Sequence, residues 1–405
     1  MCPKWSKFPG NKQICGRGVR LLALALMVFY WNSAACAESQ SSANPVGDSF
    51  ERLADRASAA LADNRIPDAI HLYQRATALR PSWSEGWWDL GTLFFDSSQF
   101  IEARDAFERF VAVERKQAGP GFGMLGLTEF KLKEYRKALV ALERGRELGL
   151  GENAEFVHSA LYHDGILNNL FGNPEIALVR LTLVANQIAA AHPESSKDAV
   201  LADTALVDAF GVGALRIQKL PSEIPSEKAA LIRQAGHAQA LIALQDRIAA
   251  GTELKQLVRS YPAEPGVHYF CGVYLLKEDP SSATEEFRHE IDISPKHAAA
   301  RIQLALEFLG SADYKQGLKY AQEAVALAPD NFVAHVACGK LWLELGNSDR
   351  ATRELQTAVR LSPGSPDAHF ALSRALSTTG HKREAAQERA KFERLKAQSD
   401  AADHQ

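Results

Sequence analysis

The chain has 405 residues, of which 46% are hydrophobic and 23% charged. These are average globular values, and they exclude a chain that is disordered throughout. The formal net charge is −3, so the basic excess of a nucleic-acid-binding protein is missing, and no nucleic-acid partner is expected. Five cysteines in this length exclude a small scaffold held together by disulfides.

The first 37 residues have the composition of an export signal. Residues 1–20 contain five basic and no acidic side chains, residues 21–31 are eleven apolar or aromatic residues, and Ala35-Cys36-Ala37 offers a small-residue cleavage site. These are the three parts of a secretory signal peptide. We therefore predict a signal peptide over 1–37 that is cleaved after Ala37, a flexible polar spacer at 38–49, and a protein that is periplasmic or associated with the cell envelope.

Two other interpretations of this segment would attach the chain to a membrane. An uncleaved anchor needs about 20 apolar residues, whereas the run up to Ala37 has seventeen, with polar interruptions. A lipid anchor on Cys36 is the second interpretation. The stretch Ser33-Ala34-Ala35-Cys36 resembles a bacterial lipobox except at Ser33, where an aliphatic residue is expected.

A repeat of about 34 residues is the main feature of the rest of the chain. In the C-terminal half this spacing separates three prolines, four small residues in each of two columns, and four large apolar residues: Pro295, Pro329, Pro363; Cys271, Ala305, Gly339, Ser373; Ala283, Gly317, Ala351, Ala385; Tyr274, Phe308, Trp342, Leu376. Two columns of small residues continue in the N-terminal half at spacings of 34, 35 and 39: Ala57, Gly91, Gly126, Gly165; Ala69, Ala103, Ala138, Ala177.

A unit with these columns resembles the tetratricopeptide repeat (TPR), in which a Trp-Leu-Gly-Tyr helix is followed by an Ala-Phe helix and a closing proline. The stretch from Trp87 to Phe107 fits closely, whereas in the unit that ends at Pro363 His335 replaces the first aromatic residue. The resemblance implies an all-α fold, a right-handed α-solenoid of stacked antiparallel helix pairs. It also implies binding of a protein or peptide rather than chemistry, and the layout resembles exported bacterial TPR proteins.

The repeat register divides the chain. We predict an N-terminal TPR array at 50–191, irregular helices or degenerate repeats at 192–262, a C-terminal array with a capping helix at 263–396, and a disordered tail at 397–405. Within the irregular part we expect helices over 198–217 and 227–249, separated by a proline-rich break. Cys271 and Cys338 fall in first helices two units apart, too far for a disulfide, so both should be free thiols.

No motif for catalysis, a cofactor or a metal is found. Gly121-Phe-Gly-Met-Leu-Gly126 has dinucleotide-fingerprint spacing but follows a predicted helix rather than a strand. No H-E-x-x-H, C-x-x-C, G-x-S-x-G or P-loop motif occurs. We interpret His335 and His369 as packing residues, and acid pairs such as Glu285-Glu286 and Glu384 with Glu388 as solvated helix faces. An enzyme, with a site in residues 186–262, is the least favoured hypothesis.

The expected function is a non-enzymatic protein–protein interaction scaffold of the cell envelope; the alternative is a periplasmic or outer-membrane assembly or chaperone-type factor with transient clients. First helices of stacked pairs should line a concave groove, and an apolar stripe there is the predicted partner site: His268, Leu275, Ile302, Leu306, Leu309, Val333, Val336, Lys340 and Leu343. Aspartates at Leu306 and Val336 should weaken binding without unfolding the chain. The sequence does not define the oligomeric state.

Overall fold

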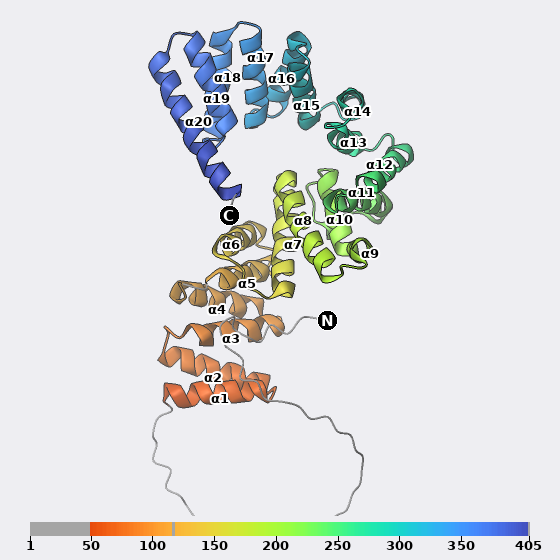
Figure 1. Cartoon of the computed structure of the whole chain (residues 1–405). Helices are drawn as coiled ribbons and strands as arrows, with labels where there is room; N and C mark the ends of the chain where they lie inside the picture. The colour runs from red at the N-terminus through yellow and green to blue at the C-terminus, as the bar shows by residue number, and fades with distance from the viewer. Residues whose placement is uncertain (1–48, 116–117, 404–405) are drawn as a thin grey trace, which may run out of the picture. The chain divides into compact units, whose positions relative to one another are not determined.

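The computed structural model describes residues 49–115 and 118–403 (Figure 1), and every regular element in these ranges is helical. The predicted signal peptide, all of the spacer but residue 49, and the cleavage site lie outside the described residues. Among the described helices, none has an apolar stretch that is long enough to cross a bilayer.

The chain divides into two compact units at residues 168/169. Unit 1 contains three helix pairs, and α7 runs from it two residues past the boundary. Its helices are α1 Phe50–Ala62, α2 Ile66–Leu79, α3 Ser84–Asp96, α4 Phe100–Val113, α5 Ala118–Lys131, α6 Tyr135–Leu148 and α7 Ala154–Leu170.

Unit 2 holds the remaining helices. The first six are α8 Pro174–Ala191, α9 Ser196–Ala202, α10 Thr204–Ala214, α11 Ala229–Ala243, α12 Arg247–Ser260 and α13 Val267–Leu275. The others are α14 Pro280–Ile293, α15 Ala298–Gly310, α16 Tyr314–Leu327, α17 Phe332–Glu344, α18 Ser348–Leu361, α19 Pro366–Thr378 and α20 Lys382–Asp403. Two short 3-10 turns, at 221–223 and 226–228, lie between α10 and α11.

The columns of small residues lie where the two helices of a pair meet, as predicted. A Cβ added at Gly91 would come within 2.7 Å of the Phe107 ring, and one at Gly339 within 2.5 Å of Leu355. The close approach buries the apolar residues of the second helix, and stacking of neighbouring pairs buries the remaining apolar face. The chain therefore folds as an α-solenoid of helix pairs.

The turn inside each pair repeats as well. One residue in the left-handed region occupies the same place in eight turns: Asn64, Ser98, Lys133, Gly172, Gln245, Ala312, Gly346 and Gly380. The second helix then begins after a capping residue, and Asp246, Asp279, Asp313 and Asn347 each accept a hydrogen bond from a backbone amide three residues on.

The middle of the chain is more regular than predicted. The single helix expected over 227–249 is wrong, because a turn around Gln245 separates α11 from α12. These two helices form a pair whose closing residue, Pro262, lies 33 residues before Pro295. The helix expected over 198–217 is also divided, at Asp203, which caps α10 by accepting from the Leu206 amide.

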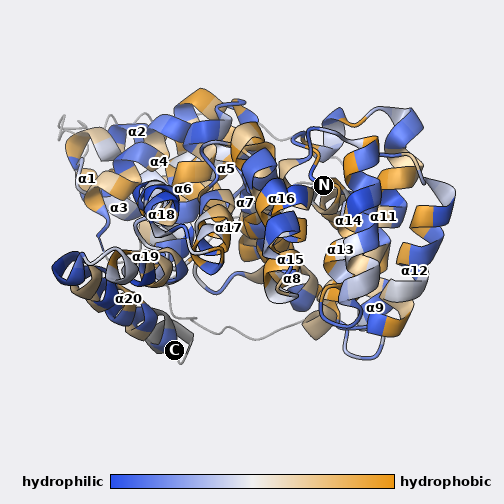
Figure 2. Cartoon of the chain, turned by 90° about the horizontal axis from the view of Figure 1, so that it is seen from above, coloured by the Kyte–Doolittle hydropathy of each residue, from blue (hydrophilic) through white to orange (hydrophobic). Residues whose placement is uncertain are grey.

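The C-terminal helix closes unit 2 and is mostly hydrophilic (Figure 2). Its packed face holds Phe392 against Phe370, with ring centroids 5.1 Å apart. The helix continues to Asp403, through most of the segment expected to be a disordered tail. Cys271 and Cys338 are free and buried, as predicted. Burial raises the pKa of each thiol to about 12.

Candidate functional site: an apolar groove and the histidine contacts of the repeats

The nine residues predicted to bind a partner do not form an exposed stripe. His268, Ile302 and Val336 are buried, with Ile302 only 5% and Val336 only 3% exposed. Ile302 packs with Ala324 and Ala334, and Val336 with Ala358 and Ala368, so both fill the space between consecutive pairs. The prediction that Val336 faces a groove is wrong, and an aspartate there would bury a charge in the core.

The other six predicted residues are half-buried: Leu275, Leu306, Leu309, Val333, Lys340 and Leu343. The five apolar ones pack against the cores of the stacked pairs. Lys340 places its Nζ 2.7 Å from both carboxylate oxygens of Asp367 in the next pair. The first helices of the C-terminal pairs therefore use these positions mainly to pack one repeat on the next.

A hollow of about 460 Å³ lies further toward the N-terminal side of unit 2. It is formed by α8, α10, α11, α12, α13 and α15, and we call it the α8–α13 groove. Its lining is mostly apolar and comprises Pro174, Glu175, Leu178, Gly213, Ala214, Arg216, Gln239, Ile242, Arg247, Tyr269, Phe270, Val273, Tyr274, Leu276, Lys277 and Gln303. A volume of this size is within the usual range for binding sites.

Three cations and one carboxylate line the groove, and two of the cations are paired with carboxylates. Arg216 pairs with Glu175 and lies over the Tyr269 ring, 5.3 Å from its centroid. Arg247 pairs with Glu278 at 2.6 Å. Lys277 is exposed. The groove therefore combines aromatic and aliphatic walls with positive charge.

Two side chains of α13, Tyr274 and Val273, line this groove. The Tyr274 hydroxyl donates to the Arg247 backbone carbonyl at 2.7 Å, which fixes the ring against α12. Val273 is 40% exposed although it is aliphatic and lies between apolar neighbours. An apolar surface held open in this way is typical of an interaction site.

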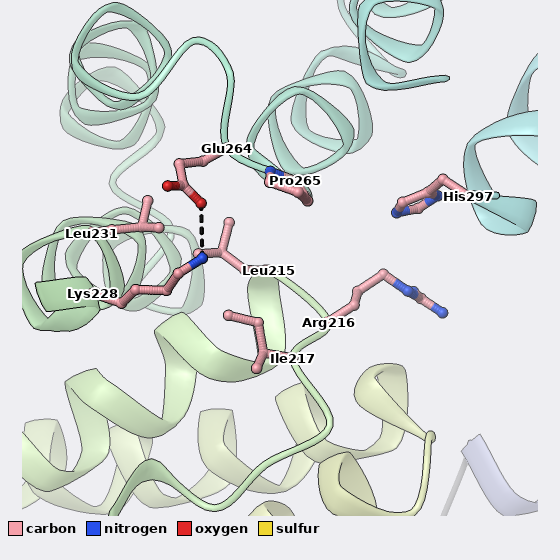
Figure 3. Close-up of a pocket in the computed structure, with 9 residues that line it drawn as sticks. Leu215, Arg216, Ile217, Lys228, Leu231, Glu264, Pro265 and His297 are labelled. Carbon is pink, nitrogen blue, oxygen red and sulfur yellow. Dashed lines mark hydrogen bonds and ion pairs between the residues drawn. The ribbon is translucent and has the colours of Figure 1, made fainter. Parts of the chain in front are cut away.

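A second, smaller cavity of about 250 Å³ is lined in part by Leu215, Arg216 and Ile217, at the end of α10 (Figure 3). Lys228 Nζ and Glu264 Oε2 are 3.0 Å apart on one side, and the His297 ring lies on the other. Burial, followed by the nearby Arg216 charge, lowers the pKa of His297 to about 4, so the ring is neutral. The volume is below the usual size of a ligand pocket, and we assign it no ligand.

A polar contact recurs in the C-terminal pairs. Three histidines, each six residues after a closing proline, use both ring nitrogens. Nε2 lies 2.9 Å from a carbonyl oxygen, in the pairs His268–Pro262, His335–Pro329 and His369–Pro363. Nδ1 lies 2.5–2.7 Å from a carboxylate of the following helix, in the pairs His268–Glu286, His335–Glu354 and His369–Glu388. Each ring therefore ties together the end of one repeat and both helices of the next.

The carbonyl oxygen carries no hydrogen, so Nε2 of each ring donates to it, and Nδ1 faces the carboxylate. The hydrogen bond to Glu286 raises the pKa of His268, against the opposing effect of burial. In the α15/α16 pair, which has no such histidine, Arg301 occupies the same position six residues after Pro295. It donates a hydrogen bond from Nε to Glu323 at 2.8 Å. The interpretation of Glu286 and Glu388 as solvated acids is wrong, because both are partners of a buried histidine. In the sequence, the six-residue spacing between each closing proline and its histidine could have indicated this histidine–carboxylate contact.

Comparison with known proteins found two family models and several solved structures that match parts of the chain. A family model described as tetratricopeptide repeat matches residues 54–121, and one described as bacterial transcriptional activator domain matches 279–401. A crystal structure of MamA is 17% identical, covering 40% of this chain and 96% of that one, with a TM-score of 0.37. MamA from residue 41 of Desulfovibrio magneticus RS-1 is 22% identical, covering 42% and 97%, with a TM-score of 0.38. No curated protein matches the chain.

The family model over residues 54–121 and the repeated helix pairs support a TPR-type protein. Proteins of this class are interaction scaffolds that bind proteins or peptides, and they are generally not enzymes.

Proposed function

We propose that this chain is a non-enzymatic scaffold of the cell envelope that holds a segment of a partner protein in the α8–α13 groove. The observation that carries the proposal is the groove itself, where an exposed aliphatic side chain, Val273, lies among aromatic walls beside three cations. Groove binding of this kind replaces the predicted stripe, whose residues are used in packing.

The lining specifies the chemistry of the partner segment. An aromatic or aliphatic anchor would cover Val273, Leu276 and the Tyr274 ring, and burial of such an anchor supplies most of the affinity of typical interfaces. Acidic residues beside the anchor would meet Lys277 and Arg247, which favour association through charge complementarity. We therefore infer a short extended or helical segment with one large apolar residue flanked by carboxylates.

A pair of valine variants tests the groove. The partner is first captured by crosslinking the tagged protein in its native envelope, and binding of the purified partner is then measured. Val273→Asp should weaken binding at least tenfold, the equivalent of about 1.4 kcal/mol. Val179→Asp is the matched control, because Val179 is 55% exposed on α8 and is outside the groove lining. Equal affinity of the two variants would contradict the proposed site.

The client range separates a scaffold from an assembly factor. One co-purifying partner whose binding depends on Val273 supports the scaffold. Salt-tolerant binding of many unfolded exported chains, unaffected by Val273→Asp, supports the chaperone-type alternative instead.

The envelope location rests on the composition of residues 1–37. N-terminal sequencing of the protein from its native host should find Glu38 first. An intact Met1 would contradict export by cleavage, and an acylated Cys36 would favour the lipid anchor.

A further inference from the structure

Two histidines and a glutamate converge between α13 and α14. Glu286 and His289 are three residues apart on α14 and thus share one face. His268 reaches the same place from α13, with its ring centroid 5.3 Å from that of His289. One potential ligand atom from each of the three residues lies within 4.8 Å of the other two.

We propose that His268, Glu286 and His289 bind one divalent transition-metal ion of the zinc type. Imidazole nitrogens and a carboxylate oxygen are ligands that Zn²⁺ prefers, and three protein ligands leave a fourth tetrahedral position for water. His289 is exposed and Glu286 half-buried, so an ion can enter from solvent and keep that water. His268, which is buried, supplies the fixed end of the site.

The contact between His268 and Pro262 orients the ring for this role. Nε2 is 2.9 Å from the Pro262 carbonyl oxygen, so it keeps its hydrogen as a donor. Nδ1, which faces Glu286, is then the nitrogen directed at the proposed ion site. A hydrogen bond from the second ring nitrogen to a carbonyl is the usual support of a metal-bound histidine.

The three ligand atoms lie within 4.8 Å of one another, so side-chain rotations must bring them to the spacing of a bound set. His268 Nδ1 and Glu286 Oε2 are 2.5 Å apart. In a tetrahedral site with bonds of about 2.0 Å, two ligand atoms lie about 3.3 Å apart. The Glu286 side chain is 22% exposed and reaches from a helix surface, so a rotation of this side chain can supply the difference.

The repeat provides internal comparisons. The pairs His335–Glu354 and His369–Glu388 have the same histidine–carboxylate contact. Three residues after their glutamates stand Thr357 and Lys391, where the α13/α14 pair has His289. Lys391 instead donates to Glu388 at 2.8 Å. Within the part of the chain that the structure describes, only the α13/α14 pair combines the contact with a third metal-ligating side chain.

The test is a titration of the full chain, stripped with a chelator, with Zn²⁺ by calorimetry and with Co²⁺ by visible absorption. His289→Ala should bind one equivalent fewer than the wild type, or bind it at least tenfold more weakly, and should lose the tetrahedral Co²⁺ bands. Because His289 is exposed, the metal-free variant should melt like the metal-free wild type. His71→Ala, at an exposed histidine of α2, should leave the titration unchanged.

A gain of function makes the test independent of any loss of folding. Thr357→His recreates the missing third ligand beside His335 and Glu354, and should add a second equivalent of bound metal. The proposal is overturned if the wild type binds no metal, or if His289→Ala binds as much metal as the wild type with the same affinity. It is also overturned if Thr357→His adds no metal while melting like the wild type.

Discussion

Gly236→Ala should destabilise unit 2 although alanine is the better helix former. Gly236 on α11 faces α10 so closely that an added Cβ would lie 1.9 Å from the Val207 backbone oxygen. Gly211 on α10 makes the reciprocal approach, with its Cβ position 2.0 Å from the Ile232 oxygen. Because both obstacles are backbone atoms, no rotation of a side chain can relieve the clash, and the helices must separate.

The size of the effect follows from that separation. A carbon and a carbonyl oxygen normally stay at least about 3.3 Å apart, so α10 and α11 would have to move apart by roughly 1.4 Å. A gap of even 0.5–1 Å loses about a quarter to a half of each dispersion contact along the pair. Overpacking of a core costs about 1–3 kcal/mol. Because the helices must separate along their backbones, we expect the upper end of this range, which outweighs the gain of about 1 kcal/mol in helix propensity.

The assay is thermal unfolding of the full chain followed by circular dichroism. At the upper end of the range the net loss is about 2 kcal/mol, which corresponds to a Tm lower by roughly 4–8 °C for a unit of this size. Gly310→Ala is the control, because no atom lies within 4 Å of its added Cβ and the change should be neutral or stabilising. If Gly236→Ala melts at or above the wild-type temperature while Gly310→Ala behaves as expected, the close contact of α10 and α11 is wrong.

Three further predictions concern other contacts. Gly339→Leu should cost about 1–3 kcal/mol, because the Leu355 side chain occupies the space that the new side chain needs, and should lower the Tm. His369→Ala should lower the midpoint of urea unfolding by the equivalent of about 1–3 kcal/mol, since it removes both contacts of a buried ring and leaves Glu388 without that partner; an unchanged midpoint would refute the role of this contact. Burial raises the pKa of Glu129 to about 7 from 4.5, so its contribution favours folding at low pH and is lost as the pH rises through about 7. Glu129→Gln should therefore be more stable than the wild type at pH 8, by on the order of 1–3 kcal/mol, and the two should converge near pH 4; parallel stability curves would contradict this.

The repeat could be predicted from sequence because each column has a simple physical cause. A second helix that packs closely needs a small residue opposite a large one, and such a pair recurs whenever the unit recurs. The degenerate unit at α11 and α12 could have been found in the same way, from Asp246 in the capping column and Pro262 in the proline column. Hydrophobic periodicity was a weaker guide there, since apolar residues are frequent on both sides of the turn at Gln245.

The candidate sites depend on the solvent exposure of individual side chains, which the repeat columns do not predict. Val336 and Val273 are the same residue type on first helices, yet one is 3% exposed between two pairs and the other 40% exposed in a groove. The difference lies in the surroundings: Val336 packs with Ala358 and Ala368, whereas Val273 lines the α8–α13 groove, and the spacing of residues along the chain does not encode this.

The sequence by itself determined the repeat, the helix pairs and the close contacts within them, because these are local consequences of residue size and spacing. Only the tertiary structure decided which apolar faces the neighbouring pairs cover, and which polar side chains meet. His268, Glu286 and His289 lie on two helices, and they converge only because the turn after α13 folds α14 back against it. Burial and convergence are properties of neighbouring helix pairs in the stack, because each pair contacts mainly the pairs beside it.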